Sequence, residues 1–340
     1  MHAKEFFKHK SILITGGTGS FGKKCVKKIL AEYEPRRVII FSRDEWKQWT
    51  MKQEHPLFDD PRLRYFLGDV RDLNRLTRAF NDVDYVIHAA ALKQVPAAEY
   101  NPSEFIKTNV VGGMNIIDAA IDAGVKKVIA LSSDKACNPI NLYGATKLCS
   151  DKLFINGNVY VGQRGYPLFS VVRYGNVIGS RGSIIPLWQK QAALSNLVTI
   201  TDPRMTRFWI TLDQAVDFVL FALKDARGGE LYVPKIPSMK IVDLAEAVAP
   251  KIPQTFTGAR EGEKLHEIMI CIEDSPHTID LKSHYIIIPE THTHKPEFLD
   301  PFLEGRSTTY LPQGFAYTSD NNDIWLTIKD LRKMIVEESI

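Results

Sequence analysis

The sequence lacks the features that mark membrane, secreted and metal-binding proteins. Its 340 residues contain no uninterrupted apolar run near the ~20 residues that a membrane span needs. The N-terminus mixes charged and aromatic side chains and has no apolar core of a signal peptide. The four cysteines lack metal-ligand spacing and fit reduced thiols, and a net charge of +3 is too small to indicate a nucleic-acid or membrane surface. We therefore expect a cytoplasmic globular protein with no bound metal.

Short apolar runs alternate with helix-forming stretches through the first half of the chain. Runs rich in Val, Ile and Leu predict strands at 11–15, 37–41, 63–67, 84–88, 127–131 and 169–173. Helical stretches between them indicate an α/β fold, a Rossmann-type doubly wound parallel sheet. After about residue 176 this rhythm stops, which predicts a smaller C-terminal α/β lobe. We expect one domain at 8–177 and about 206–233, and the lobe at about 178–205 and 234–340.

A glycine-rich turn follows the first predicted strand. Gly16, Gly19 and Gly22 have the spacing G-x-x-G-x-x-G, and they stand between a strand and a helix. Small residues there let the backbone approach a pyrophosphate, whose charge the N-terminus of the next helix stabilises. The turn predicts a dinucleotide site. Its expected contacts are Thr15, Gly16, Thr18, Gly19, Ser20 and Phe21.

The end of the second predicted strand bears on the choice between NAD and NADP. An acidic residue there suits the ribose hydroxyls of NAD, whereas a hydroxyl with an arginine suits the 2′-phosphate of NADP. Ser42, Arg43 and Lys47 favour NADP, although Asp44 offers a competing ribose contact.

Later strand ends supply further cofactor positions. Asp69 follows the third strand and is placed to accept a hydrogen bond from the adenine amine. The small side chains of Ala89 and Ala91 let a cofactor lie close, although tight helix–sheet packing explains them equally. The remaining expected cofactor contacts are Val70, Lys93, Tyr143, Lys147 and Val177.

The most informative segment runs from Ser132 to Lys147. Tyr143 and Lys147 are four residues apart, so on a helix they share one face. A lysine cation there favours tyrosinate, which lets the phenol remove a hydroxyl proton during hydride transfer. Asp134 and Lys135 add a second acid and a second base, which simple alcohol oxidation does not need.

Together these motifs resemble the extended short-chain dehydrogenase/reductases. More narrowly, the chain is similar to the inverting UDP-N-acetylglucosamine 4,6-dehydratases, especially those that start pseudaminic acid synthesis for flagellin glycosylation. The matching segments are 15–22, 42–44, 68–72, 88–93, 134–135, 138–147, 173–177, 206–209 and 262–267. The resemblance implies UDP-GlcNAc as substrate, a nucleotide-sugar-binding C-terminal lobe, and a homo-oligomer, with a hexamer expected. Roles after about Cys271 stay open, and Cys137 stands where we expect a small residue such as alanine.

The resemblance also implies a catalytic set of Lys135, Asp134, Tyr143 and Lys147. Tyr143 takes the proton of the sugar 4-hydroxyl, Lys135 removes the C5 proton as a neutral amine, and Asp134 protonates the leaving 6-hydroxyl. Positive charge from Lys147 and the oxidised nicotinamide is expected to keep Lys135 neutral. A proton then returns to C5 on the opposite face. Whether Tyr143 supplies it is left open.

Several polar residues are candidates for substrate binding. Ser133 or Ser132 can bind the 4-hydroxyl or simply cap a turn. Arginines suit the diphosphate because guanidinium forks match phosphate oxygens. Lys93 and Asn176 each have a plainer reading, as a surface lysine and a turn asparagine. The expected substrate contacts are Lys93, Ser133, Asn176, Arg181, Arg204, Arg260 and Glu263, with Arg207 a further diphosphate candidate.

Residue 135 separates the competing functions. An NADP-dependent alcohol dehydrogenase or a UDP-sugar 4-epimerase needs Tyr143 and Lys147 but no C5 base. By family analogy, a retaining 4,6-dehydratase carries an acidic residue at 135. A non-catalytic NADP-binding regulator would have lost the Tyr143–Lys147 pair, which is intact.

Overall fold

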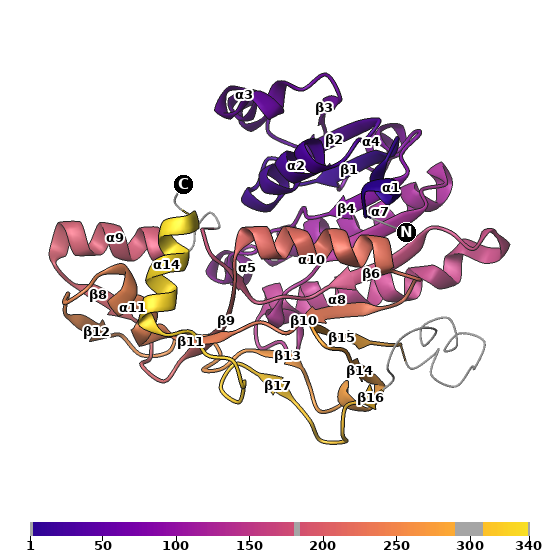
Figure 1. The fold of residues 1–340 in the computed structure, drawn as a ribbon. Helices are drawn as coiled ribbons and strands as arrows, with labels where there is room; N and C mark the ends of the chain where they lie inside the picture. The colour runs from indigo at the N-terminus through magenta and orange to yellow at the C-terminus, as the bar shows by residue number, and fades with distance from the viewer. Residues whose placement is uncertain (1–2, 180–183, 290–308, 339–340) are drawn as a thin grey trace.

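The computed structural model describes residues 3–179, 184–289 and 309–338, and its centre is one large twisted sheet (Figure 1). Within these residues ten strands join in the order β16-β14-β15-β10-β6-β5-β4-β1-β2-β3. The neighbours from β10 to β3 all pair in parallel. These strands are β1 (Ser11–Thr15), β2 (Arg37–Ser42), β3 (Leu63–Leu67), β4 (Tyr85–His88), β5 (Lys127–Leu131), β6 (Leu168–Val172) and β10 (Leu231–Pro234). The predicted Rossmann-type fold is confirmed.

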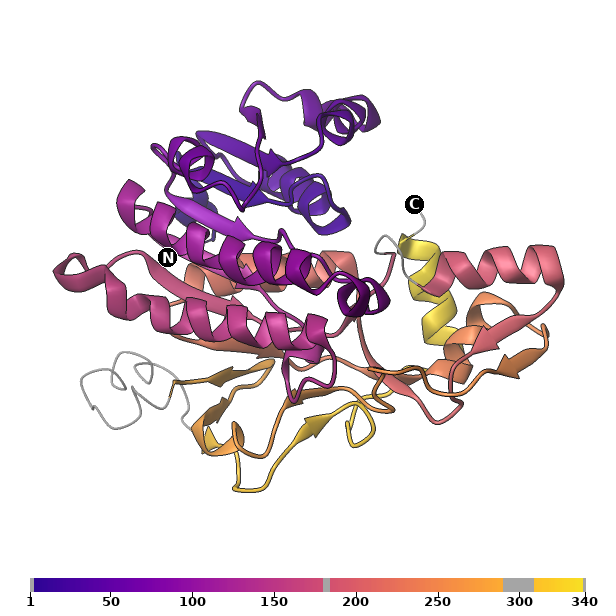
Figure 2. The same cartoon turned by 180° about the vertical axis from the view of Figure 1, so that it is seen from behind.

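Helices cover both faces of this sheet. Helices α2 (Ser20–Glu32) and α10 (Leu212–Asp225) contact each other on the face seen in Figure 1. The opposite face, seen in Figure 2, carries α4 (Leu73–Ala79), α7 (Gly112–Ala123) and α8 (Leu142–Asn156). The central strands β1 and β4 are buried along their whole length, as expected for parallel strands between two helical layers. Their carboxyl ends all meet at one edge.

Shorter helical segments connect these elements. They are α1 (Ala3–Phe7), α3 (Glu45–Glu54), α5 (Val95–Tyr100), α6 (Pro102–Phe105), η1 (Pro56–Asp59), η2 (Ile106–Val111), η3 (Asp134–Ala136), η4 (Gly157–Arg164) and η5 (Ser275–His277).

Part of the C-terminal segment assigned to the smaller lobe lies in the main sheet. Strand β15 (His284–Ile287) pairs antiparallel with β10, and β14 (Thr278–Asp280) and β16 (Thr309–Tyr310) extend the same edge. The strand β15 is fully buried, so its apolar side chains belong to the main core. Strands as short as these give little sequence signal, and the exact domain boundaries remain a prediction.

The smaller lobe has a second apolar core beside the sheet (Figure 1). Trp188, Met205, Met239, Leu244 and Leu331 are buried in it. Its elements are α9 (Ile184–Ser195), α11 (Ile241–Val248), α14 (Ile328–Glu338), β8 (Val198–Ile200), β12 (Gln254–Phe256), β9 (Thr206–Ile210), β11 (Ser238–Lys240) and β7 (Asn176–Val177). Strand β13 (Ile268–Ile270), paired with β17 (Tyr317–Thr318), leads from this lobe back towards the sheet. None of the described helices is long and apolar enough to cross a membrane.

Candidate active site

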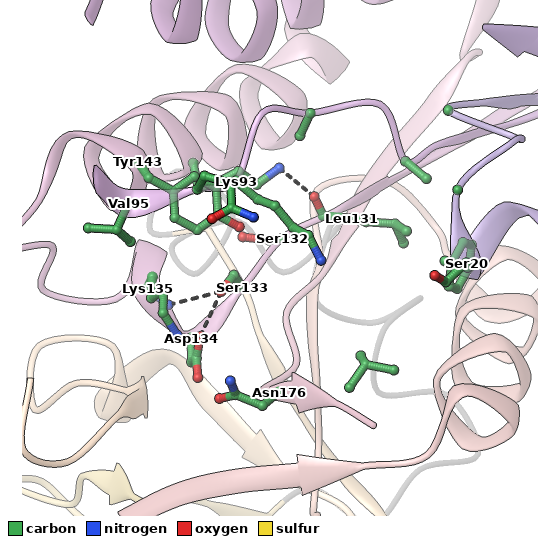
Figure 3. A pocket seen from close by; sticks show the side chains of 18 of the residues that line it. Ser20, Lys93, Val95, Leu131, Ser132, Ser133, Asp134, Lys135, Tyr143 and Asn176 are labelled. Atoms are coloured by element: carbon green, nitrogen blue, oxygen red, sulfur yellow. Dashed lines mark hydrogen bonds and ion pairs between the residues drawn. The ribbon is translucent and has the colours of Figure 1, made fainter. Parts of the chain in front are cut away.

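A cavity of about 1050 Å³ lies between the carboxyl ends of the parallel strands and the smaller lobe. It is lined by the glycine turn, by the segments after β2, β4 and β5, and by residues of the smaller lobe. Ligands of open α/β sheets bind at this edge. In Figure 3, Ser20 of the glycine turn lies across the cavity from Asp134, Lys135 and Tyr143.

The glycine turn is shaped for close approach by a ligand. Gly16 has φ +67°, and a Cβ there would lie 3.0 Å from the backbone of Ala90. The Gly19 N–H donates to the Gly16 carbonyl at 2.9 Å, and α2 begins at the next residue. The turn lines the cavity through Gly16, Thr18, Gly19, Ser20 and Phe21. A dinucleotide pyrophosphate fits this cradle, because side chains are absent where it would lie.

Thr15 does not line the cavity. Its side chain is fully buried, its Oγ1 lies 2.8 Å from His88 Nδ1, and it accepts a hydrogen bond from the Ala90 N–H at 3.2 Å. Thr15 therefore joins the ends of β1 and β4 beneath the glycine turn, a supporting role and not the predicted contact.

Ser42, Arg43 and Lys47 all line the cavity. The Ser42 hydroxyl accepts a hydrogen bond from Gln48 Nε2 at 2.9 Å, while the Arg43 guanidinium is half exposed. The Asp44 carboxylate caps α3 by accepting from the Lys47 N–H at 3.0 Å, and it lies 3.1 Å from Lys47 Nζ. Asp44, the predicted competitor for a ribose contact, also lines the cavity, and its carboxylate is paired with Lys47 there.

The later strand ends bring most of the remaining cofactor candidates to the cavity. Val70, Ala89, Ala91, Lys93 and Val177 line it. Ala90, which we did not assign, lines it as well, and the run of three alanines was the available signal.

Asp69 does not line the cavity. Its Oδ2 accepts from Arg71 Nη2 at 2.8 Å and lies 3.7 Å from Arg43 Nη1. Asp69 therefore lies beside the side chain predicted to select NADP, and the adenine contact expected of it stays a prediction.

The reactive side chains gather in the turn after β5 (Figure 3). Ser133 caps the short helix η3 by accepting from the Lys135 N–H, which places Asp134 and Lys135 past the strand end as predicted. The Lys135 Nζ lies 3.2 Å from Asp134 Oδ1 and 3.0 Å from Glu267 Oε1. The Ser133 hydroxyl donates to Asp134 Oδ1 at 2.6 Å. An ammonium group thus lies between two carboxyl groups.

The charges of this cluster differ from the prediction at Lys135. Burial alone lowers the pKa of Lys135, but the carboxylates of Asp134 and Glu267 outweigh it, and the pKa is raised above its usual value. These two carboxyl groups favour the ammonium form of Lys135 over the resting neutral amine that we expected, and the effect expected of the oxidised nicotinamide stays a prediction. The pKa of Asp134 is raised, because the effect of burial exceeds the opposite effect of the Lys135 charge. The buried Asp134 Oδ2 has no hydrogen-bond partner among the described residues.

Tyr143 and Lys147 both lie on α8 and line the cavity, but the pKa of Tyr143 is shifted in the direction opposite to the tyrosinate that we expected. Burial raises the pKa of Tyr143 to about 12, and the charge of Lys135 and a hydrogen bond with Ser133 offset this only in part. The Lys147 Nζ donates to the Leu131 carbonyl at 2.5 Å, and burial lowers the pKa of Lys147. The raised pKa favours the neutral phenol form of Tyr143.

Sequence reasoning missed a role for Glu267. Its side chain is 3% exposed, and its Oε1 also lies 3.6 Å from Arg207 Nε. Burial raises the pKa of Glu267, but the charges of Lys135 and Arg207 lower it by more. The pKa is therefore below its usual value, and Glu267 is a carboxylate. The only available signal was its place in the matching segment 262–267. Arg207, a diphosphate candidate, lines the cavity but pairs with this carboxylate.

Most of the predicted substrate contacts surround the cavity. Lys93, Ser133, Asn176, Arg260 and Glu263 line it. Asn176 Oδ1 and Glu263 Oε2 are buried and have no hydrogen-bond partner among the described residues, so both can accept from a ligand. Burial, with the charge of Lys135 second, lowers the pKa of Lys93.

One predicted contact lies away from the cavity, a second is already hydrogen-bonded, and the position of a third is not described. Arg204 is 70% exposed and pairs with Asp202 at 2.7 Å, outside the residues that line the cavity. Ser132 donates its hydroxyl hydrogen bond to the buried Asp151 at 2.8 Å. Arg181 lies outside the described residues.

Two cysteines that are distant in sequence lie together below this site. The ligand atoms of Cys137, Cys271 and Asp274 lie within 4.8 Å of one another. The Arg173 guanidinium is 3.6 Å from the Asp274 carboxylate and already supplies positive charge there. This charge disfavours a cation at the three residues.

Comparison with known proteins identifies the family. Residues 12–289 match the family model described as polysaccharide biosynthesis protein. The chain belongs to this family. A member from Campylobacter jejuni, named UDP-N-acetylglucosamine 4,6-dehydratase (inverting), is 52% identical, with 97% of this chain and 98% of the relative covered. A more distant relative from Rickettsia akari, named UDP-glucose 4-epimerase, is 39% identical over 97% of this chain and 96% of its own.

Solved structures of the same fold extend this result. Pen from Bacillus thuringiensis is 35% identical, with a TM-score of 0.85 over 98% of this chain and 99% of its own. DesIV from Streptomyces venezuelae, a dTDP-glucose 4,6-dehydratase with NAD and TYD bound, is 25% identical, with a TM-score of 0.66 over 75% and 86%. The resemblance to the inverting 4,6-dehydratases is confirmed, and the family's fold spans nearly the whole chain.

Proposed function

We propose that this protein is an inverting UDP-N-acetylglucosamine 4,6-dehydratase, a lyase. Its product would be UDP-2-acetamido-2,6-dideoxy-β-L-arabino-hexos-4-ulose. The observation that carries the proposal is the ammonium of Lys135 between the carboxyl groups of Asp134 and Glu267. This cluster shares a cavity with Tyr143 and with a glycine turn shaped for a dinucleotide. Acid, base and redox site thus lie within reach of one sugar.

The chain's own residues account for the proton transfers. A bound nicotinamide dinucleotide supplies hydride uptake from C4 and hydride return to C6. Tyr143 accepts the proton of the 4-hydroxyl, and the resulting ketone acidifies the C5 proton. Because Tyr143 is a phenol without ligands, its activation requires the positive charge that an oxidised cofactor brings.

The elimination step follows from the Lys135–Asp134 contact. Transfer of one proton from Lys135 Nζ to Asp134, 3.2 Å away, gives a neutral amine beside a carboxylic acid. The raised pKa of the buried Asp134 favours this transfer, whereas the raised pKa of Lys135 opposes it. Lys135 then takes the C5 proton as the C6–O bond breaks, and Asp134 gives its proton to the departing hydroxyl, which leaves as water. The pair returns to ammonium and carboxylate, and C5 is reprotonated from the opposite face.

We further propose NADP as the cofactor. Arg43 and Lys47 offer two cations beside the Ser42 hydroxyl, while Asp44 is engaged as a helix cap. A 2′-phosphate would find both charges at the end of β2, where a ribose hydroxyl would not need them.

The finer biological setting is also part of this proposal. We expect the protein to form a homo-oligomer, most simply a hexamer. We also expect it to act in the cytoplasm, at the start of pseudaminic acid synthesis for flagellin glycosylation. The sequence resemblance supports these points, and the 52% identity to an enzyme named for the same reaction supports the reaction itself.

A 4-epimerase is the competing function, since relatives of 39% identity carry that name. Epimerisation at C4 leaves C5 and the 6-hydroxyl untouched, so it has no use for a base and an acid paired as Lys135 and Asp134 are.

Incubation of the purified protein with UDP-GlcNAc in D2O, followed by NMR, separates these functions. We expect a 4-keto-6-deoxy sugar with inverted configuration and deuterium at C5. A 4-keto sugar that keeps its 6-hydroxyl, or epimerisation at C4 alone, would contradict the dehydratase. Retained configuration at C5 would indicate a retaining enzyme.

A further inference from the structure

We infer that Glu267 is the positioning residue for the C5 base: its fixed negative charge orients Lys135 and stabilises the ammonium that forms when Lys135 takes the C5 proton. This inference rests on the proposed dehydratase function and adds to it a residue with no previously assigned role.

The contact between the two side chains is short and sheltered. The Glu267 Oε1 lies 3.0 Å from Lys135 Nζ, and the Glu267 side chain is only 3% exposed. An ion pair away from water is both stronger and better defined in geometry than one on the surface. Glu267 therefore restricts where the Lys135 amine can lie.

The backbone of Glu267 is itself held by Ser319, the residue after β17. Its N–H donates to Ser319 Oγ at 2.9 Å, and its carbonyl accepts from the Ser319 N–H at 2.8 Å. The Ser319 hydroxyl lies 2.6 Å from Thr206 Oγ1 on β9. The C-terminal segment, for which the sequence offered no function, thus helps to fix a charge in the active site.

Several charged or titratable groups face Lys135 and Glu267. They are Asp134 from η3, Tyr143 from α8, Lys93 before α5, Arg207 from β9, and Lys264 in the segment before β13. When Asp134 holds the proton destined for the leaving hydroxyl, it carries no charge. At that moment Glu267 is the negative charge nearest to Lys135 among the described residues. An ammonium then forms on Lys135 beside two further cations, Lys93 and Arg207, and Glu267 offsets them.

The test compares Glu267→Gln with the wild-type protein. Glutamine keeps the size and removes the charge. We expect kcat for the dehydrated product to fall about 100-fold, the size of a general-base effect, while KM for UDP-GlcNAc changes less than about threefold. The basic limb of the kcat–pH profile should move to lower pH by about one unit, because the Lys135 ammonium loses a carboxylate partner. C4 oxidation in a single turnover, followed by absorbance of the reduced cofactor, should persist.

Two further variants separate positioning from a structural role. Glu267→Asp keeps the charge on a shorter stem, and we expect it to recover part of kcat and the wild-type pH profile. Glu246→Gln, at a partly exposed carboxylate paired with Arg332 on another part of the chain, should leave both unchanged. If Glu267→Gln fails to fold, the kcat–pH profile of Glu267→Asp decides the question. A wild-type kcat in that variant, together with a displaced basic limb of its pH profile, would contradict the inference.

The inference is overturned if Glu267→Gln keeps the wild-type kcat and pH profile, or if C4 oxidation falls as much as dehydration. Failure of the proposed function looks different, because the wild-type protein would then form no 4-keto-6-deoxy product from UDP-GlcNAc.

Discussion

The two sides of the cavity differ in the burial and charge of the groups that line them. The glycine-turn side offers backbone N–H groups, small side chains and partly exposed cations such as Arg43. The opposite side holds charged groups that are buried and paired, with Asp134 and Glu267 each at most 3% exposed around Lys135. One side is shaped for binding a phosphate-rich ligand, and the other is charged for moving protons.

This difference has an energetic consequence. A buried charge is costly unless it is paired, so removing one member of the reactive cluster leaves its neighbour unpaired. An exposed cation contributes little to the stability of the fold, so its loss mainly weakens ligand binding. The two sides should therefore respond to substitution with very different magnitudes.

The largest effect is expected on the reactive side. Lys135→Ala removes the proposed C5 base, and we expect product formation from UDP-GlcNAc to fall about 1,000-fold, within the range of general-base catalysis. Cofactor affinity, measured by fluorescence titration with NADP, should stay within about twofold. Lys152→Ala on the exposed face of α8 is the matched control and should behave as wild type. Comparable losses of activity and cofactor affinity would show that the two sides are not separable.

A second prediction concerns His88, which lies beneath both sides. Burial, with the charge of Lys147 second, lowers the pKa of His88 to about 3 from an ordinary value near 6.5. Below pH 6.5 the unfolded chain binds a proton that the folded protein does not, so stability falls as the pH falls. Between pH 6.5 and pH 5 this amounts to about 2 kcal/mol, at ~1.4 kcal/mol per pH unit.

Chemical denaturation at pH 7.5 and pH 5 measures this effect. We expect His88→Gln, which can keep a hydrogen bond to Thr15, to lose less stability over this range than the wild-type protein. The same pH dependence in both proteins would mean that His88 takes up its proton in the folded state.

The two sides also differ in how far the sequence predicts them. The residues of the glycine turn, like Tyr143 and Lys147, are near neighbours in the sequence, so their spacing alone indicates them. Glu267 meets Lys135 across 132 residues, and tertiary contacts such as the pairing of β13 with β17 and the hydrogen bonds of Ser319 bring it there.

Charge states were harder still to predict. The expected neutral Lys135 and the expected tyrosinate both depended on which group lies nearest, which spacing along a helix does not determine. For Arg204 a local signal existed, because Asp202 two residues earlier is well placed to pair with it.

The smallest effect is expected on the cofactor side, at Arg43. This guanidinium is half exposed and lies 3.7 Å from Asp69, so its removal should not disturb the fold. Arg43→Ala should weaken NADP binding about tenfold, the value of one charge-assisted hydrogen bond, and leave NAD binding within about twofold. Isothermal titration with each dinucleotide measures both constants, and Lys52→Ala, a neighbouring exposed cation that does not line the cavity, serves as control. Equal losses for NADP and NAD would mean that Arg43 does not read the 2′-phosphate. The charged end of β2 would then serve binding in general, as the glycine turn does, and cofactor choice would lie with other residues.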